Sequence, residues 1–303
     1  MKIDIYAHIL PETYFAAFRK KNKTVLADVY TVAPYVINLQ DRLRLMERYP
    51  DVLQVISVMQ PPLDGFVEPA DAVELARIAN DEVAELVAKY PDKFAAGVAC
   101  LPMNDMDATL EEADRAIKQL GLKGVQIYSR VNGETVDSPQ LRPLYEKMAA
   151  YDLPIWIHPL GRHFRPGAPR GLPDDGVFDL LFETSYAMQR LVLSGIFREF
   201  PNIKFIVHHS GAMIPLVENR FPHIEQFRNF YGDTATYGAT PPLMLAHTFF
   251  GADHLLFATD SPLGPKFGCT LDVVHAVERM DVPEADKEKI FLRNATKLMK
   301  LAI

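Results

Sequence analysis

The chain has 303 residues, of which 49% are hydrophobic and 23% are charged, and its formal net charge is −7. This length suits one large α/β barrel or two ordinary domains, and the charge gives no reason to expect a nucleic acid or an anionic membrane as partner. Cys100 and Cys269 stand far apart, so we expect isolated thiols rather than a disulfide framework. Residues 1–5 do not resemble a signal peptide, and no apolar run approaches the ~20 residues of a membrane span. We therefore expect a cytoplasmic protein.

Short apolar runs alternate with longer amphipathic stretches along the chain. The runs are rich in Val, Ile and Phe, as is typical of strands buried on both faces. In chain order they are residues 2–7, 52–59, 94–101, 123–128, 154–158 and 203–208, a weaker candidate at 229–234, and 255–259. The stretches with helical periodicity are residues 70–90, 108–120, 141–151, 178–200, 271–280 and the terminal 286–301. In the first of these, Val73, Ala76 and Val83 fall on one stripe, and Pro91 follows its end.

Repeated alternation of strand and helix, without a long polar linker, indicates parallel strands joined by crossover helices. Eight candidate strands fit a TIM-like (β/α)₈ barrel better than an open sheet, so we predict one domain over residues 1–303. Residues 13–38, after the first strand, are long enough to form a lid or a small insertion over the site. Residues 161–176 are rich in Pro and Gly and form either a mobile flap over the mouth or a surface excursion.

Residues of the kinds that bind metals stand at the ends of four of these strands. They are Tyr6 and His8 on the first strand, His158 on the fifth, His208 and His209 on the sixth, and Asp260 on the eighth. In a barrel of parallel strands, functional groups gather where the strands end. Imidazoles from three strands and a carboxylate from a fourth, all at one mouth, suit a borderline divalent ion such as zinc, with an open position for water or substrate.

Several short motifs in a fixed order relate the chain to a known family. They are IDIYAHILP at 3–11, YPDKFA at 90–95, LP at 101–102, GLKGVQ at 121–126, LPIWIHP at 153–159, FPNIKF at 200–205, HSGAMIP at 209–215 and TDSP at 259–262. With these motifs the chain resembles, over nearly its whole length, the amidohydrolase-related family of aminocarboxymuconate-semialdehyde decarboxylase and the resorcylate-type decarboxylases. The resemblance implies a distorted TIM-like barrel with one divalent metal ion, zinc being favoured and manganese the alternative.

The resemblance also implies roles for individual residues. By position, His8, His158 and Asp260 match metal ligands of the family, and Asp260 also matches a proton relay. His209 matches a sixth-strand histidine that acts near the metal as a ligand or proton carrier. His208 is then its strand neighbour, which we expect to be structural.

One position departs from the family pattern. Relatives carry His or Glu as the first metal ligand, where this chain has Tyr6. A neutral phenol is a poor ligand because its pKa of about 10 keeps it protonated. Three arrangements stay open: Tyr6 ligates as a phenolate; the ion rests on His8, His158 and Asp260 with an added water; or the site is metal-free, and Tyr6, His158 and His209 act as proton donors or electrophilic stabilisers.

The closest motif agreement is with decarboxylating members of the family. We therefore predict a carboxy-lyase that acts on a small aromatic or unsaturated carboxylate, with His209, Asp260 and Tyr6 as catalytic residues. The same scaffold can activate water, so a hydrolase or hydratase of a lactone, amide or enol acid is the alternative. A metal-free or inactive barrel is the third hypothesis, because Tyr6 replaces a ligand.

A substrate carboxylate calls for a cationic clamp near the strand ends. The candidates are Arg130, after the fourth strand, and Arg162, His163 and Arg165, in the loop after the fifth. Arg42, Arg44 and Arg48, in contrast, are expected on the polar face of the first helix. The resemblance also implies a homo-oligomer, either a dimer or a tetramer.

Overall fold

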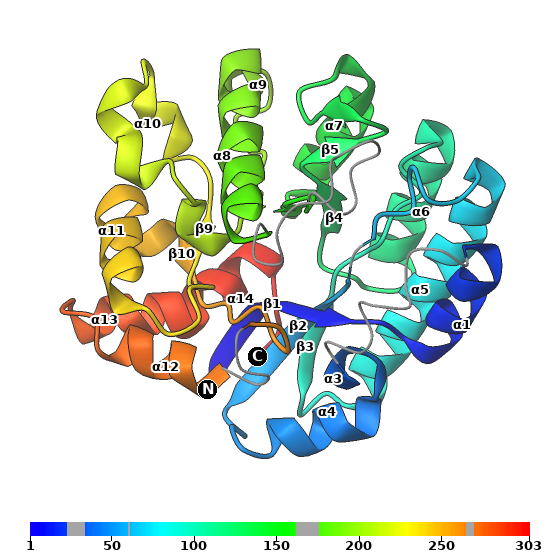
Figure 1. Cartoon of the computed structure of the whole chain (residues 1–303), viewed down its shortest axis with the longest axis horizontal. Helices are drawn as coiled ribbons and strands as arrows, with labels where there is room; N and C mark the ends of the chain where they lie inside the picture. The colour runs from blue at the N-terminus through cyan, green and yellow to red at the C-terminus, as the bar shows by residue number, and fades with distance from the viewer. Residues whose placement is uncertain (23–33, 60, 162–175, 265–269) are drawn as a thin grey trace.

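The computed structural model of the chain describes residues 1–22, 34–59, 61–161, 176–264 and 270–303. Strands occupy its centre and helices surround them (Figure 1). The parallel strands are β1 (Lys2–Ile9), β2 (Val52–Val58), β3 (Phe94–Gly97), β4 (Val125–Tyr128), β7 (Ile155–His158), β8 (Phe205–Val207), β9 (Gly232–Asp233) and β10 (Leu255–Leu256). Each of the eight strands expected from the sequence has a counterpart here, although most are shorter than the apolar runs that predict them.

Parallel pairing follows these strands around a circle. One sheet has the order β1-β2-β3, a second β4-β7-β8, and a third joins β9 to β10. Parallel bridges connect the sheets at Ala99–Val125, Ile206–Tyr231 and Ala7–Ser261. The last bridge brings the segment after β10 back to β1. This is the strand order of a TIM-like barrel, in which the carboxyl ends of all strands share one mouth.

A short antiparallel hairpin was not expected from the sequence. β5 (Arg130–Val131) pairs with β6 (Glu134–Thr135) beyond the end of β4. Asn132 and Gly133 form its turn, with φ of 51° and 81°. An Asn-Gly pair between short extended segments is a strong hairpin signal, because both residues accept positive φ.

The helices of the outer layer largely follow the expected pattern. They are α1 (Glu12–Lys21), α3 (Pro34–Ile37), α4 (Leu39–Met46), α5 (Pro69–Lys89), α6 (Met106–Lys118), α7 (Arg142–Tyr151), α8 (Gly176–Ser194), α9 (Ile196–Glu199), α10 (Ile224–Phe227), α11 (Thr240–Phe250), α12 (Thr270–Glu278), α13 (Glu284–Glu288) and α14 (Asn294–Met299). The helix expected over 178–200 is divided at Gly195, whose φ is 79°. A π-helical turn at Lys289–Arg293 joins α13 to α14. Helix α11 was missed; it carries two prolines in its first turn, where proline is tolerated.

The segment 13–38, expected to form a lid or an insertion, is described only at its two ends. Its first part is α1, which lies at the edge of the molecule beside α5 (Figure 1). Tyr14 and Phe18 are buried there, and the Tyr14 amide donates a hydrogen bond of 2.6 Å to the Glu82 carboxylate. Residues 23–33 lie outside the described residues, as does most of the flap expected at 161–176, so the lid and the flap stay predictions.

An apolar layer inside the barrel forms the floor beneath the mouth. It contains Ile3 and Ile5 of β1 and the single tryptophan, Trp156, all at most 1% exposed. The Trp156 indole donates a hydrogen bond of 2.9 Å to the Ile5 carbonyl. A Cβ on Gly124 would lie 2.6 Å from the Trp156 ring, so only glycine fits beside it. Among the helices described, none combines the length and apolarity that crossing a bilayer requires.

Candidate functional site

The residues singled out at the strand ends gather at one mouth of the barrel. Tyr6 and His8 belong to β1, where a register shift between Asp4 and Ala7 interrupts the ladder with β2. His158 is the last residue of β7, and Asp260 lies four residues beyond β10. Bulges of this kind re-aim side chains beside functional sites. These residues, distant in the chain, lie close together at the mouth, and their roles stay predictions.

Tyr6 lies at the centre of a group of imidazoles. Its ring stacks on His208, with centroids 3.5 Å apart, and meets His8 edge-on at 4.5 Å. The centroids of His158 and His209 lie 5.7 Å and 6.3 Å from that of Tyr6. Tyr6 is 2% exposed, and burial holds the pKa of its hydroxyl well above the ordinary value, with the charge of Asp260 adding to the shift. The phenol is therefore protonated at neutral pH.

His8 and Asp260 are in contact without forming a well-directed hydrogen bond. His8 Nε2 lies 3.0 Å from Asp260 Oδ1, yet neither atom has a hydrogen-bond partner within the described part of the chain. Burial raises the pKa of Asp260, but His8, His209 and Tyr237 outweigh it and hold the pKa below the ordinary value. A carboxylate oxygen and an imidazole nitrogen thus lie side by side, and neither is hydrogen-bonded to a described residue.

The hydrogen bonding of His158 fixes which of its nitrogens carries the proton. Nδ1 lies 2.8 Å from the Pro159 carbonyl, which can only accept, so Nδ1 donates. Burial, together with His8 and His208, holds the pKa of His158 well below its ordinary value. The ring is therefore neutral, and Nε2 keeps its lone pair. An imidazole anchored through its other nitrogen is the usual form of a metal ligand.

His208 is anchored by a carboxylate that the sequence reading missed. Its Nδ1 lies 2.8 Å from Asp233 Oδ2, while Asp233 Oδ1 accepts from the backbone amides of Ser210 and Ala235 at 3.1 Å and 3.0 Å. Burial raises the pKa of Asp233 to about 6 and lowers that of His208 well below its ordinary value. Asp233 ends β9, the weakest of the expected strands. Its position at a strand end is the sequence signal that could have identified it.

The spacing of two imidazoles at the mouth is that of ligands to one divalent ion. Imidazoles that share an ion through metal–nitrogen bonds of about 2.1 Å have ring centroids about 4.5–5.5 Å apart, and those of His8 and His158 are 5.2 Å apart. Among the described residues, however, no group of three or more His, Cys, Asp or Glu side chains is arranged so that it could hold a metal ion. The two imidazoles alone have the spacing of metal ligands, and in an open catalytic site water or substrate completes the coordination.

Two tyrosines at the mouth were not anticipated. The Tyr237 hydroxyl, in the turn after β9, donates a hydrogen bond to Asp260 Oδ2. The Tyr128 ring, at the end of β4, lies 5.2 Å from that of His158 and packs with Leu160 and Phe66 in a small apolar cluster. Neither position belongs to a motif of acids and histidines, so the sequence carried no signal for them.

Of the four candidates for a cationic clamp, Arg130 is the one that lies among the described residues. The Arg130 guanidinium pairs with Glu183 of α8, which is almost wholly buried, at 3.2 Å. The Ser129 hydroxyl donates to the same carboxylate at 2.9 Å. A substrate carboxylate would have to compete with Glu183, so a substrate-binding role for Arg130 stays a prediction. Three further candidates lie outside the described residues: Arg162, His163 and Arg165.

Arg42 corrects another expectation. It was placed on a polar helix face but is fully buried, because α4 turns it toward β1. Its Nη1 donates to the His8 carbonyl at 2.6 Å, and Nε and Nη2 donate to Gln54 at 3.2 Å and 2.7 Å. Gln54 in turn donates to Asp4, at 3.2 Å. A chain of polar contacts thus supports the backbone of His8 from behind.

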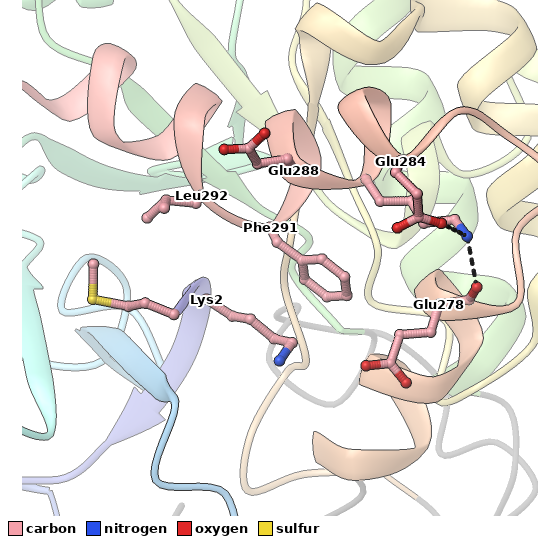
Figure 2. A pocket seen from close by; sticks show the side chains of 8 residues that line it. Lys2, Glu278, Glu284, Glu288, Phe291 and Leu292 are labelled. Atoms are coloured by element: carbon pink, nitrogen blue, oxygen red, sulfur yellow. Dashed lines mark hydrogen bonds and ion pairs between the residues drawn. The ribbon is translucent and has the colours of Figure 1, made fainter.

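A hollow of about 500 Å³ lies at the opposite end of the barrel, where β1 begins (Figure 2). Phe291 and Lys2 form part of its wall, and the Lys287 ammonium bonds the Glu278 carbonyl and the Glu284 carboxylate at 2.9 Å and 2.7 Å. Lys2 is also paired, with Asp51. Both lysines are therefore already paired with carboxylates, Lys2 with Asp51 and Lys287 with Glu284. The lining of this hollow includes none of the residues gathered at the mouth.

Comparison with known proteins agrees with this geometry. Residues 3–301 match the family described as amidohydrolase. Gamma-resorcylate decarboxylase of Polaromonas sp. strain JS666 is 32% identical over 301 residues, which cover 88% of this chain and 89% of that protein. A decarboxylase of 2-amino-3-carboxymuconate-6-semialdehyde from Dictyostelium discoideum is 32% identical over 172 residues, 56% of this chain and 47% of its own length. The structure of a dihydroxybenzoic acid decarboxylase from Polaromonas sp. JS666, with bound manganese and the inhibitor 2-nitroresorcinol, matches with a TM-score of 0.80 at 28% identity, covering 99% and 96% of the two chains.

Proposed function

Because the chain belongs to this amidohydrolase family, we propose that it is a carboxy-lyase that removes CO₂ from a small aromatic carboxylate. The observation that carries the proposal is the group of His8, His158 and Asp260 around the protonated phenol of Tyr6, in a chain 32% identical to a resorcylate decarboxylase. Hydrolysis of a lactone or amide is the weaker alternative, since the relatives compared above are named as decarboxylases.

We propose a divalent metal ion as the cofactor, with His8 Nε2, His158 Nε2 and Asp260 Oδ1 as its ligands. Three observations on the described residues support this assignment: His8 Nε2 and Asp260 Oδ1 have no hydrogen-bond partner, His158 Nε2 keeps its lone pair, and the two rings have a suitable spacing. When bound, the ion would draw electron density away from the reacting carbon through a carboxylate or hydroxyl oxygen of the substrate. Manganese in the related decarboxylase supports manganese at least as well as zinc.

Decarboxylation also requires a proton at the carbon that loses CO₂. The C–C bond breaks, its electron pair stays on the ring carbon, and a proton must reach that carbon as CO₂ leaves. Tyr6 is proposed as the donor, because burial keeps its hydroxyl protonated rather than ionised. In this proposal Tyr6 is not a ligand. His209 is half-buried, with an unpartnered Nδ1 in the described structure, and is proposed to return a proton to Tyr6 from solvent, with Asp260 assisting.

The test combines metal analysis with an assay of CO₂ release. The purified chain, supplied with Mn²⁺ or Zn²⁺, is incubated with gamma-resorcylate and other hydroxylated benzoates. We expect about one metal ion per chain, CO₂ from at least one benzoate, and loss of both in His158→Ala. A chain that binds metal but releases no CO₂ from any of these acids would argue against the carboxy-lyase. A cytoplasmic location and a homo-oligomer of two or four subunits complete the proposal, and sedimentation measures the latter.

A further inference from the structure

The carboxylate of Asp260 has a close neighbour at each of its oxygens, but only Oδ2 accepts a hydrogen bond from a described residue. Oδ1 lies 3.0 Å from His8 Nε2, and Oδ2 accepts the hydrogen bond from the Tyr237 hydroxyl. A carboxylate can only accept, so the phenol must be the donor in this pair. Asp260 is 4% exposed, which leaves little solvent to replace a lost partner. The rotation of this carboxylate therefore depends on Tyr237.

Tyr237 stands in a turn that is fixed from two sides. Its φ is 50°, a left-handed conformation that costs free energy in a bulky residue and persists only where the surroundings impose it. Gly238 follows with φ of 98°, and a Cβ there would lie 3.0 Å from Asp272 Cβ of α12. Thr234, before the turn, both donates to the Ala258 carbonyl and accepts from the Ala258 amide at 2.9 Å. The strained turn is thus anchored to α12 and to the segment after β10.

We propose that Tyr237 is a positioning residue that fixes the orientation of the Asp260 carboxylate. Its hydrogen bond to Oδ2 keeps Oδ1 beside His8 Nε2, where both atoms can bind the proposed metal ion. The inference rests on the metal ligands of the proposed function. Partners that hydrogen-bond a ligating carboxylate orient it, and their loss typically weakens metal binding. Without the phenol, the Asp260 carboxylate is free to rotate about its Cβ–Cγ bond, and Oδ2 is left without this donor.

The experiment titrates Mn²⁺ alone into the full-length, metal-free protein and into two variants. Tyr237→Phe removes only the hydroxyl, and Tyr231→Phe is the matched control, since Tyr231 stacks on His254 away from the site. We expect Mn²⁺ to bind Tyr237→Phe about 10–100-fold more weakly, and Tyr231→Phe as tightly as the parent. Both variants should unfold at the same temperature as the parent when metal-free. In an Asp260→Asn background, Tyr237→Phe should weaken Mn²⁺ binding no further.

Several results would overturn the inference. Mn²⁺ binding of parent affinity by Tyr237→Phe would do so, as would an equal loss in the Asp260→Asn background, because Tyr237 would then act elsewhere. A Tyr237→Phe protein that no longer unfolds cooperatively would point to a purely structural role. If the parent binds Mn²⁺ but does not decarboxylate, the proposed function fails while the affinities still test Tyr237. If the parent binds no Mn²⁺, the metal site and the role of Tyr237 fall together.

Discussion

Tyr6 and His208 stack face to face, with ring centroids 3.5 Å apart and planes inclined by only 13°. Asp233 locks the His208 ring through Nδ1, and two backbone amides lock Asp233. The Tyr6 ring thus packs face to face on a neutral imidazole, that of His208, which directly follows β8. The pairing gives His208 the structural role expected for it and leaves His209 nearer to solvent.

The hydroxyl of Tyr6 is the group on which proton transfer is proposed to depend. Tyr6→Phe keeps the stack on His208 and removes only that hydroxyl. We expect kcat for decarboxylation to fall about 10²–10⁴-fold, the usual contribution of a general acid, with Mn²⁺ affinity unchanged. Steady-state kinetics and a metal titration measure the two effects separately. Loss of Mn²⁺ binding in this variant would instead identify Tyr6 as a phenolate ligand.

Removal of the His208 ring should act on stability. His208→Ala leaves a cavity beneath Tyr6 and strips the buried Asp233 carboxylate of its side-chain partner, so we expect a loss of roughly 3–5 kcal/mol in the free energy of unfolding. Urea denaturation measures this. His254→Ala is the control, because His254 also stacks on a tyrosine, Tyr231 at 4.3 Å, but is only half-buried. Equal losses in the two variants would show that the Asp233 anchor contributes nothing.

Burial of Asp4 predicts a dependence of stability on pH. Burial raises its pKa from 3.8 to about 6, against hydrogen bonds from Thr259 that lower it. The folded state therefore holds this proton more tightly than the unfolded state, and ionising Asp4 between about pH 4 and pH 6 lowers the free energy of unfolding. The shift corresponds to about 2–3 kcal/mol.

Asp4→Asn isolates this contribution, because asparagine does not titrate. The variant also loses a hydrogen-bond acceptor, which lowers its stability at every pH. We expect the parent's advantage over Asp4→Asn to be largest near pH 4, to shrink toward pH 6 and to stay constant above that. Urea denaturation at several pH values measures the difference. An advantage that grows with pH would mean that the folded-state pKa of Asp4 lies below its ordinary value.

The eight strands, and the position of His8, His158 and Asp260 at one mouth, were predictable because both depend on local patterns. A strand buried on both faces must be apolar along its length, and in a parallel barrel its polar end residue must face the common mouth. The register shift of β1 between Asp4 and Ala7 could not be predicted in this way, because it depends on pairing with β2.

The residues that were missed act through contacts that no local pattern encodes. Tyr237 reaches Asp260 only because its turn adopts a positive φ that the sequence does not favour for tyrosine. From the sequence, Asp233 was only the end of a weak strand. Its role comes from the contact with the imidazole of His208, which lies 25 residues earlier in the chain. Arg42 followed the periodicity of a charged helix face, yet the acceptors at His8 and Gln54 make its burial favourable.

Arg42 therefore supports a last prediction. Its guanidinium is wholly buried, and Arg42→Ala leaves the His8 carbonyl and the Gln54 amide without their donor in the interior. We expect a loss of about 3–5 kcal/mol in the free energy of unfolding, as for other broken buried charge networks. Arg44, two residues along the same helix, has a side chain that is 70% exposed and paired only with Asp41. Arg44→Ala should cost no more than about 1 kcal/mol. Urea denaturation of both variants tests the contrast, and equal losses would mean that the buried network contributes no more than a surface ion pair.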